Sequence, residues 1–140
     1  MSRKNRKINE KFLSAYIELD KLCCAKFGVE INGVTEYINR LQNARFAPNR
    51  DELLKTLGKY RNLRNRFAHE PQAIRKCDDI SKADVKWVGK FKKSVKGKKD
   101  PISKYLKKAR RFARRRKTGK ILLGLIVLAA IVVAGVVVLL

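Results

Sequence analysis

The sequence has few of the residues that most often build metal sites and disulfides. It contains one histidine, His69, and three cysteines, Cys23, Cys24 and Cys77, with no CxxC spacing. A structural zinc site usually needs four cysteine or histidine ligands, and an odd number of cysteines does not fit a full set of disulfides. We therefore expect reduced, buried thiols, and neither a metal site nor a cofactor within one chain.

Acidic residues are also scarce, and their scarcity is uneven. The chain has 12 Asp and Glu against 35 Lys and Arg, a formal net charge of +23. Residues 85–120 hold 17 basic residues and one acid, whereas residues 1–84 hold 18 basic residues and 11 acids. Much of the basic surplus therefore lies in one stretch near the C-terminal end.

Strand-like alternation, internal repeats and the glycine-rich phosphate loops GxGxxG and GxxxxGK[ST] are missing. Apolar residues instead recur three or four positions apart, which is the spacing of an amphipathic helix. The predicted helices cover residues 7–27, 33–46, 50–69 and 82–95. Four such helices with short connections predict an all-α, antiparallel four-helix bundle over residues 1–97.

Local signals predict where these helices begin and end. Asn49 precedes the third helix, and Glu52 stands three residues later, which together predict a capping box. Ser81 is the predicted N-cap of the fourth helix. Pro71 disfavours helical geometry at the residue before it, so the third helix should end near His69.

The only long apolar run is "ILLGLIVLAAIVVAGVVVLL", residues 121–140, which has no charged or strongly polar residue. As a helix it would be about 30 Å long, the hydrocarbon thickness of a bilayer. It predicts a C-terminal transmembrane helix that acts as a tail anchor. The N-terminal stretch "MSRKNRKINE" has no apolar run of the kind found in secretory signals. Basic residues next to the span predict that the N-terminal domain faces the cytoplasm.

Residues 98–120 predict a basic juxtamembrane helix, for which three roles are open. It could set membrane topology, bind anionic lipid head groups, or bind RNA phosphates. The aromatic residues in and before it could stack on bases, but their spacing is more typical of an apolar helix face. We favour topology together with lipid contact, and keep RNA recruitment as the secondary role.

The end of the third predicted helix combines an arginine, an amide and the sole histidine. Asn65 and His69 are four residues apart and share a face, which Arg61 and Gly58 continue toward the N-terminus. Arg64 falls instead on the line of apolar residues. Glycine is unfavourable within a helix, so Gly58 predicts the close approach of another backbone.

Two interpretations of this helix end compete. Basic groups and histidine are favoured near a helix C-terminus by about 0.3–1 kcal/mol through the helix dipole, with no further function. Alternatively, imidazole exchanges protons near neutral pH, guanidinium holds phosphate oxygens in a bidentate manner, and an amide can orient either group. We favour the functional interpretation for the three residues taken as a set.

The stretch "LRNRFAHEP", residues 63–71, resembles the signature of the HEPN (higher eukaryotes and prokaryotes nucleotide-binding) domain family. In that family an arginine followed by a polar residue is separated from a histidine by four to six intervening residues. Here Arg64 is followed by Asn65, and four residues separate Arg64 from His69. The resemblance implies a four- or five-helix bundle that dimerises with its motifs facing each other. Many members are metal-independent ribonucleases, often toxins or antiviral effectors.

Carried over, the resemblance implies that His69 is a general base or acid, Arg64 holds the phosphate and Asn65 positions the reacting groups. Arg61 and Arg66 are further candidates for binding nucleic acid. We therefore expect a membrane-anchored endoribonuclease that acts on RNA as a homodimer. The alternatives are a non-catalytic module that binds nucleic acid or a protein, and a structural membrane adaptor.

Overall fold

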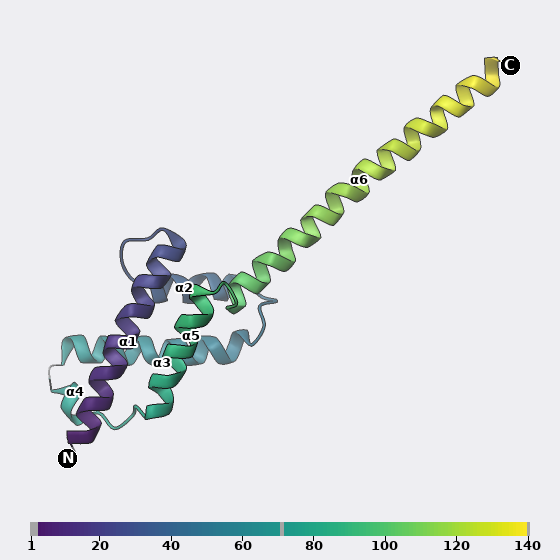
Figure 1. The fold of residues 1–140 in the computed structure, drawn as a ribbon. Coiled ribbons are helices and arrows are strands. Elements are labelled where there is room, and N and C mark those ends of the chain that lie inside the picture. Colours follow the sequence, from purple (N-terminus) through teal and green to yellow (C-terminus); the bar gives the residue numbers. More distant parts are fainter. Residues whose placement is uncertain (1–2, 71, 140) are drawn as a thin grey trace. The chain divides into compact units, whose positions relative to one another are not determined.

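A computed structural model describes residues 3–70 and 72–139 of the chain, and the side chains of residues 5–70 and 72–129. Every regular element within these ranges is a helix, which confirms the predicted all-α class (Figure 1). The helices are α1 (Arg3–Phe27), α2 (Gly33–Asn43), α3 (Arg50–His69), α4 (Ala73–Lys76), α5 (Lys82–Lys96) and α6 (Pro101–Leu139).

The helix boundaries agree with the sequence signals at α3 and differ at three other helices, the first being α1, which begins at Arg3 rather than at residue 7. The third helix covers the predicted residues, and Glu70 after it is extended with φ −121°, as the following proline requires. Helix α2 ends at Asn43 rather than at the predicted residue 46. Helix α4 was not predicted, because four residues are too few to show a helical period.

One predicted cap is confirmed and the other is wrong. At Ser81 the capping box is complete: the Ser81 hydroxyl accepts from the Asp84 N–H, and the Asp84 carboxylate accepts from the Ser81 N–H at 2.8 Å. At Asn49 the backbone is left-handed, with φ 53°, and its side chain makes no cap hydrogen bond. A capping side chain needs an extended backbone at the N-cap, whereas asparagine tolerates the left-handed conformation adopted here.

The chain divides into two compact units, Met1–Tyr105 and Leu106–Leu140. In the first unit, α1 packs against α2 and α5, and α3 packs against α2. The buried side chains with no exposed surface are Phe12, Leu19, Cys23, Tyr37, Leu41, Leu57, Val88, Asn9 and Asp100. Edge-to-face and stacked rings connect several helices of this core: Phe12 meets Tyr60, Tyr60 meets Trp87, Trp87 stacks on Phe91, and Phe91 meets Tyr37.

Two helix backbones approach each other closely at Gly33. A Cβ atom built on Gly33 would overlap the backbone oxygen of Asp20 and the backbone nitrogen of Cys24. The Asp20 carboxylate then accepts a hydrogen bond of 2.8 Å from the Val34 N–H, at the start of α2. Glycine is thus required where α2 begins, because any side chain would push α2 away from α1.

The second unit is the remainder of α6, and its side chains are exposed from Leu106 to Ala129. Within the described part of the chain, no helix combines the length and the apolar character that crossing a bilayer requires. The predicted transmembrane segment, residues 121–140, extends over residues 130–140, whose side chains lie outside the described part. Of the predicted basic segment, residues 98–105 belong to the first unit.

Candidate functional site

The last turns of α3 carry the predicted site residues on accessible surface. Arg61 and Arg64 are half-buried, whereas Asn65 and His69 are exposed. The Arg64 guanidinium donates a hydrogen bond of 3.3 Å from Nη1 to the Asn65 side-chain oxygen. His69 is the last residue of the helix. The structure therefore brings Arg64 and Asn65 together and leaves the His69 side chain on the surface.

Arg64 and His69 leave the helix in different directions. Five residues of an α-helix turn through about 500°, so the two side chains diverge by about 140° around the axis. Burial and the Asp20 charge raise the pKa of the Tyr16 hydroxyl in α1, and the positive charges of Arg64 and Arg61 oppose that rise. The two side chains of one copy therefore start from different sides of the helix.

Gly58 continues the exposed face of Asn65 and His69, but no neighbouring backbone approaches it. A Cβ atom placed there would meet nothing within 4 Å. The predicted close approach is therefore wrong within this chain, and it occurs at Gly33 instead. The surface above Gly58 is open to a second molecule.

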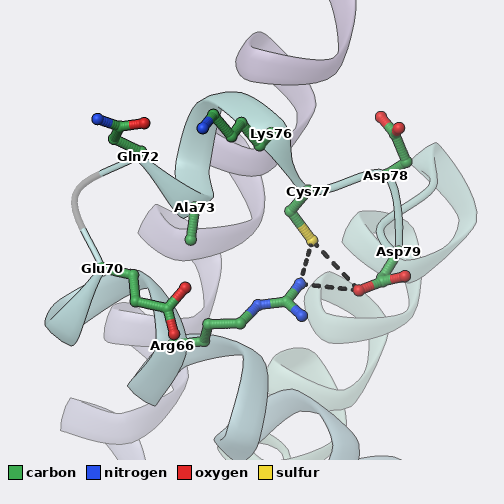
Figure 2. A pocket seen from close by; sticks show the side chains of 8 residues that line it. All are labelled: Arg66, Glu70, Gln72, Ala73, Lys76, Cys77, Asp78 and Asp79. Atoms are coloured by element: carbon green, nitrogen blue, oxygen red, sulfur yellow. Dashed lines mark hydrogen bonds and ion pairs between the residues drawn. The ribbon is translucent and has the colours of Figure 1, made fainter.

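Arg66, predicted to bind nucleic acid, lies on a different side of α3 and is already bound. Its Nη2 atom donates to Asp79 Oδ2 at 2.8 Å and to Cys77 Sγ at 2.6 Å (Figure 2). The hydrogen bond from Arg66 lowers the pKa of the Asp79 carboxyl, and the same bond raises the pKa of Arg66. Arg66 thus holds the segment after α4 against α3.

An open pocket of about 650 Å³ lies beside this contact. Figure 2 shows that the side chains around it include both signs of charge: Arg66, Glu70, Gln72, Ala73, Lys76, Cys77, Asp78 and Asp79. Within the part of the chain that the structure describes, no three His, Cys, Asp or Glu residues gather as metal ligands would. The pocket is separate from the face that carries Arg64 and Asn65.

The most deeply buried charge, Asp100, was not among the predicted site residues. Its side chain is fully buried, and its carboxylate accepts hydrogen bonds from Lys26 Nζ at 2.7 Å, Ser103 Oγ at 2.7 Å and Tyr37 OH at 2.8 Å. Burial alone would raise the pKa of Asp100, but these hydrogen bonds outweigh it and hold the pKa below its usual value. Sequence reasoning missed the burial of Asp100 because its partners Lys26 and Tyr37 are far away in the sequence.

These four side chains join three parts of the first unit. Lys26 lies near the end of α1, Tyr37 lies in α2, and Ser103 lies in the first turn of α6. The same carboxylate also accepts from the Ser103 N–H at 3.2 Å, so it caps α6. The cluster is therefore a structural joint that fixes the start of α6 against the bundle.

The comparison with known protein families matches the chain to the model of a family of unknown function, DUF6548, over residues 10–122. No curated protein and no solved structure matches the chain. The matched stretch includes α2 to α5, the exposed end of α3 and the basic part of α6. Since the match covers most of its length, the chain belongs to the DUF6548 family.

Proposed function

We propose that this protein is a HEPN-like module that cleaves RNA with the residues at the end of α3. The observation that carries the proposal is the accessible set Arg64, Asn65 and His69, with Arg61 one turn before Asn65. Arg61 and Arg64 supply positive charge for phosphate oxygens, and the imidazole can transfer a proton. The bundle supports these residues on a long helix whose opposite face is buried.

The chemistry needs no group beyond these side chains and the RNA itself. A base removes the proton from the 2′-hydroxyl, the 2′-oxygen attacks the adjacent phosphorus, and an acid protonates the departing 5′-oxygen. The products are a 2′,3′-cyclic phosphate and a free 5′-hydroxyl. His69 serves as base or acid, Arg64 stabilises the charge on the phosphorane, and Asn65 holds the Arg64 guanidinium by the hydrogen bond described above.

A homodimer supplies what one chain lacks. Each chain has one histidine, whereas the reaction uses both a base and an acid. In a two-fold dimer built on the open face of Gly58, Asn65 and His69, the second chain would contribute its own His69 and Arg64. The divergence of Arg64 and His69 within one chain supports this arrangement, because an arginine from one copy can then serve a phosphate near the histidine of the other.

The test is cleavage of mixed RNAs by the full-length protein and by matched variants. We expect His69→Ala to lower the cleavage rate by about 10²–10⁴-fold, the usual contribution of general acid–base catalysis. Arg64→Lys should also lose much of the activity, since lysine keeps the charge but lacks the bidentate fork. Lys55→Ala, an exposed change on the same helix, is the control and should keep full activity.

Two further arms identify the chemistry. DNA of the same sequence should remain intact, because it has no 2′-hydroxyl, and cleavage of RNA should continue in EDTA. If the wild-type protein leaves RNA uncut, the catalytic proposal is wrong. One observation favours a non-catalytic RNA-binding module in that case: no hydrogen bond within the described residues orients the His69 ring, whereas the half-buried Arg61 and Arg64 could still bind phosphates.

We also propose that residues 121–140 insert into a bilayer and that the bundle lies on its cytoplasmic side. Seven large apolar side chains of α6 between Ile121 and Leu128 are more than half exposed. The preceding residues, 104–120, include ten Lys and Arg residues and no Asp or Glu. Lipid would cover the apolar side chains, and the cations would stay in the head-group region. Release of the full-length protein from membranes by alkaline carbonate would contradict the insertion.

A further inference from the structure

The first half of α6 within the second unit has two distinct faces. Leu106, Ala109, Phe112 and Ala113 form an apolar stripe, since their positions fall within about 120° around the helix axis. Leu106 is 42% exposed and Phe112 is 71% exposed, so the stripe offers apolar surface to a partner. The opposite face carries only cations: Lys107, Lys108, Arg110, Arg111, Arg114 and Arg115.

We propose that this stripe docks on the surface of an anionic membrane, with α6 lying in the plane of the lipid head groups before its apolar end enters the bilayer. An amphipathic helix of this kind buries its apolar side chains at the boundary between head groups and acyl chains. The long basic side chains extend toward the phosphates. The inference deepens the proposed membrane insertion and rests on it for bringing the stripe to the surface.

The charges of α6 indicate which partner covers the apolar stripe. No acidic residue occurs from residue 101 to residue 140, so a second copy of α6 would bring cations against cations. RNA bound on the cationic face would leave Phe112 and Leu106 in water, because they lie on the other side of the helix. An anionic bilayer satisfies both faces at once, because it offers negative head groups and apolar chains in adjacent layers.

The apolar stripe also ends a few residues before the apolar run that we propose to insert into the bilayer. Arg116 takes the next position on the same side, and Lys117 and Lys120 follow before the apolar run begins. Between them, Thr118 donates from its hydroxyl to the Arg114 carbonyl at 2.7 Å, a bond that often bends helices. Gly119 is a weak helix former next to it, and a Cβ atom there would meet nothing within 4 Å. This pair provides a bending point between the surface part and the inserted part.

The test places a single tryptophan at chosen positions of the full-length chain in a Trp87→Phe background. The protein is reconstituted in vesicles of phosphatidylcholine and phosphatidylglycerol, and brominated lipids quench tryptophans that touch acyl chains. The reporters are Phe112→Trp on the stripe, Arg111→Trp on the cationic face and Leu128→Trp in the apolar run. We expect several-fold stronger quenching at 112 than at 111, a blue-shifted emission at 112, and strong quenching at 128.

The outcomes separate this inference from the insertion on which it rests. Strong quenching at 128 with equally weak quenching at 112 and 111 would keep the insertion and overturn the surface helix. Equal, strong quenching at all three positions would also overturn it, because the helix would then run straight into the bilayer. A blue-shifted but unquenched reporter at 112 would show a protein interface instead. Absent quenching at 128 would contradict the insertion itself.

The lipid charge gives a second readout. In vesicles of phosphatidylcholine alone, quenching at 112 should fall several-fold, while quenching at 128 should not change. Quenching at 112 that is independent of phosphatidylglycerol would contradict the role of the cationic face. High salt should weaken the contact at 112 in the same direction, since salt screens exposed charges.

Discussion

Two polar clusters of the first unit differ in how their hydrogen bonds are satisfied. At the start of α6, the fully buried Asp100 has partners in Lys26, Tyr37 and Ser103, all within 2.8 Å. At the end of α3, Arg64 makes one hydrogen bond among the described residues, of 3.3 Å to its neighbour Asn65. The Asp100 carboxylate thus finds its hydrogen-bond partners within the chain. The Arg64 guanidinium can donate further hydrogen bonds to a ligand.

The difference indicates which cluster serves folding and which is available for binding. A buried charge must find its partners inside the protein, because desolvation would otherwise destabilise the fold by several kcal/mol. Exposed groups are solvated by water and can exchange that water for a ligand at little cost in stability. We therefore expect substitutions of Asp100 to lower the stability of the fold, and substitutions of Arg64 and His69 to lower the rate of RNA cleavage.

The largest effect on stability is expected from Asp100→Ala. Removal of the carboxylate leaves the mostly buried Lys26 ammonium without its partner, and breaking such pairs typically costs about 3–5 kcal/mol. Chemical unfolding of the full-length chain in mild detergent, followed by circular dichroism, measures the loss. Asp51→Ala, at a carboxylate that is 89% exposed, is the control and should change the free energy of unfolding by less than about 0.5 kcal/mol. Equal losses of stability in Asp100→Ala and Asp51→Ala would contradict the expected difference between a buried and an exposed acid.

Smaller changes in stability, of opposite sign, are expected when two helical glycines are replaced by alanine. Gly33→Ala forces a methyl group into the backbone of α1 and should destabilise the protein by about 1–3 kcal/mol, as overpacking does. Gly58→Ala adds a methyl group in open space and should stabilise α3 by about 0.5–1 kcal/mol through helix propensity. Both values come from the same unfolding measurement.

The glycine pair also probes the proposed dimer. If Gly58→Ala raises stability but weakens dimerisation in sedimentation experiments, the open face of α3 is the dimer contact. A dimer unaffected by Gly58→Ala would place the contact elsewhere.

The acid dependence of stability gives a third test. The pKa of Asp100 is lower in the folded chain than in the unfolded chain, so its contribution is present above the unfolded value of about 4 and is lost as the pH falls through the folded value. The melting temperature of the wild type should therefore fall more steeply below about pH 4 than that of Asp100→Asn, which has no carboxylate to protonate. Parallel curves for the two proteins would show that Asp100 does not contribute to acid sensitivity.

The smallest effect on stability is expected at the exposed cluster. His69→Ala and Arg64→Ala should each change the free energy of unfolding by no more than about 1 kcal/mol, the range of helix-dipole and surface contacts. The same two proteins should lose RNA cleavage, since each lacks a side chain that the proposed reaction uses. A loss of several kcal/mol at either residue would mean that the motif supports folding.

Helix periodicity in the sequence was enough to predict α1, α2, α3 and α5, because each buries one face over several turns. The end of α3 at His69 could also be predicted, since Pro71 constrains its neighbour directly. The left-handed backbone at Asn49 could not, because asparagine suits both a cap and that conformation. The burial of Asp100 and the bound state of Arg66 depend on partners 74 and 13 residues away, respectively, which no local pattern encodes.

The row of aromatic rings in the core makes the protein its own spectroscopic probe. Trp87 is the only tryptophan, and its ring lies 5.3 Å from that of Tyr60 and 5.1 Å from that of Phe91, between centroids. Light absorbed by Tyr60 should therefore pass to Trp87 by energy transfer, but only while α3 and α5 stay packed. Excitation spectra of the tryptophan emission would then follow the opening of the bundle in an unlabelled chain, inside a membrane or outside it.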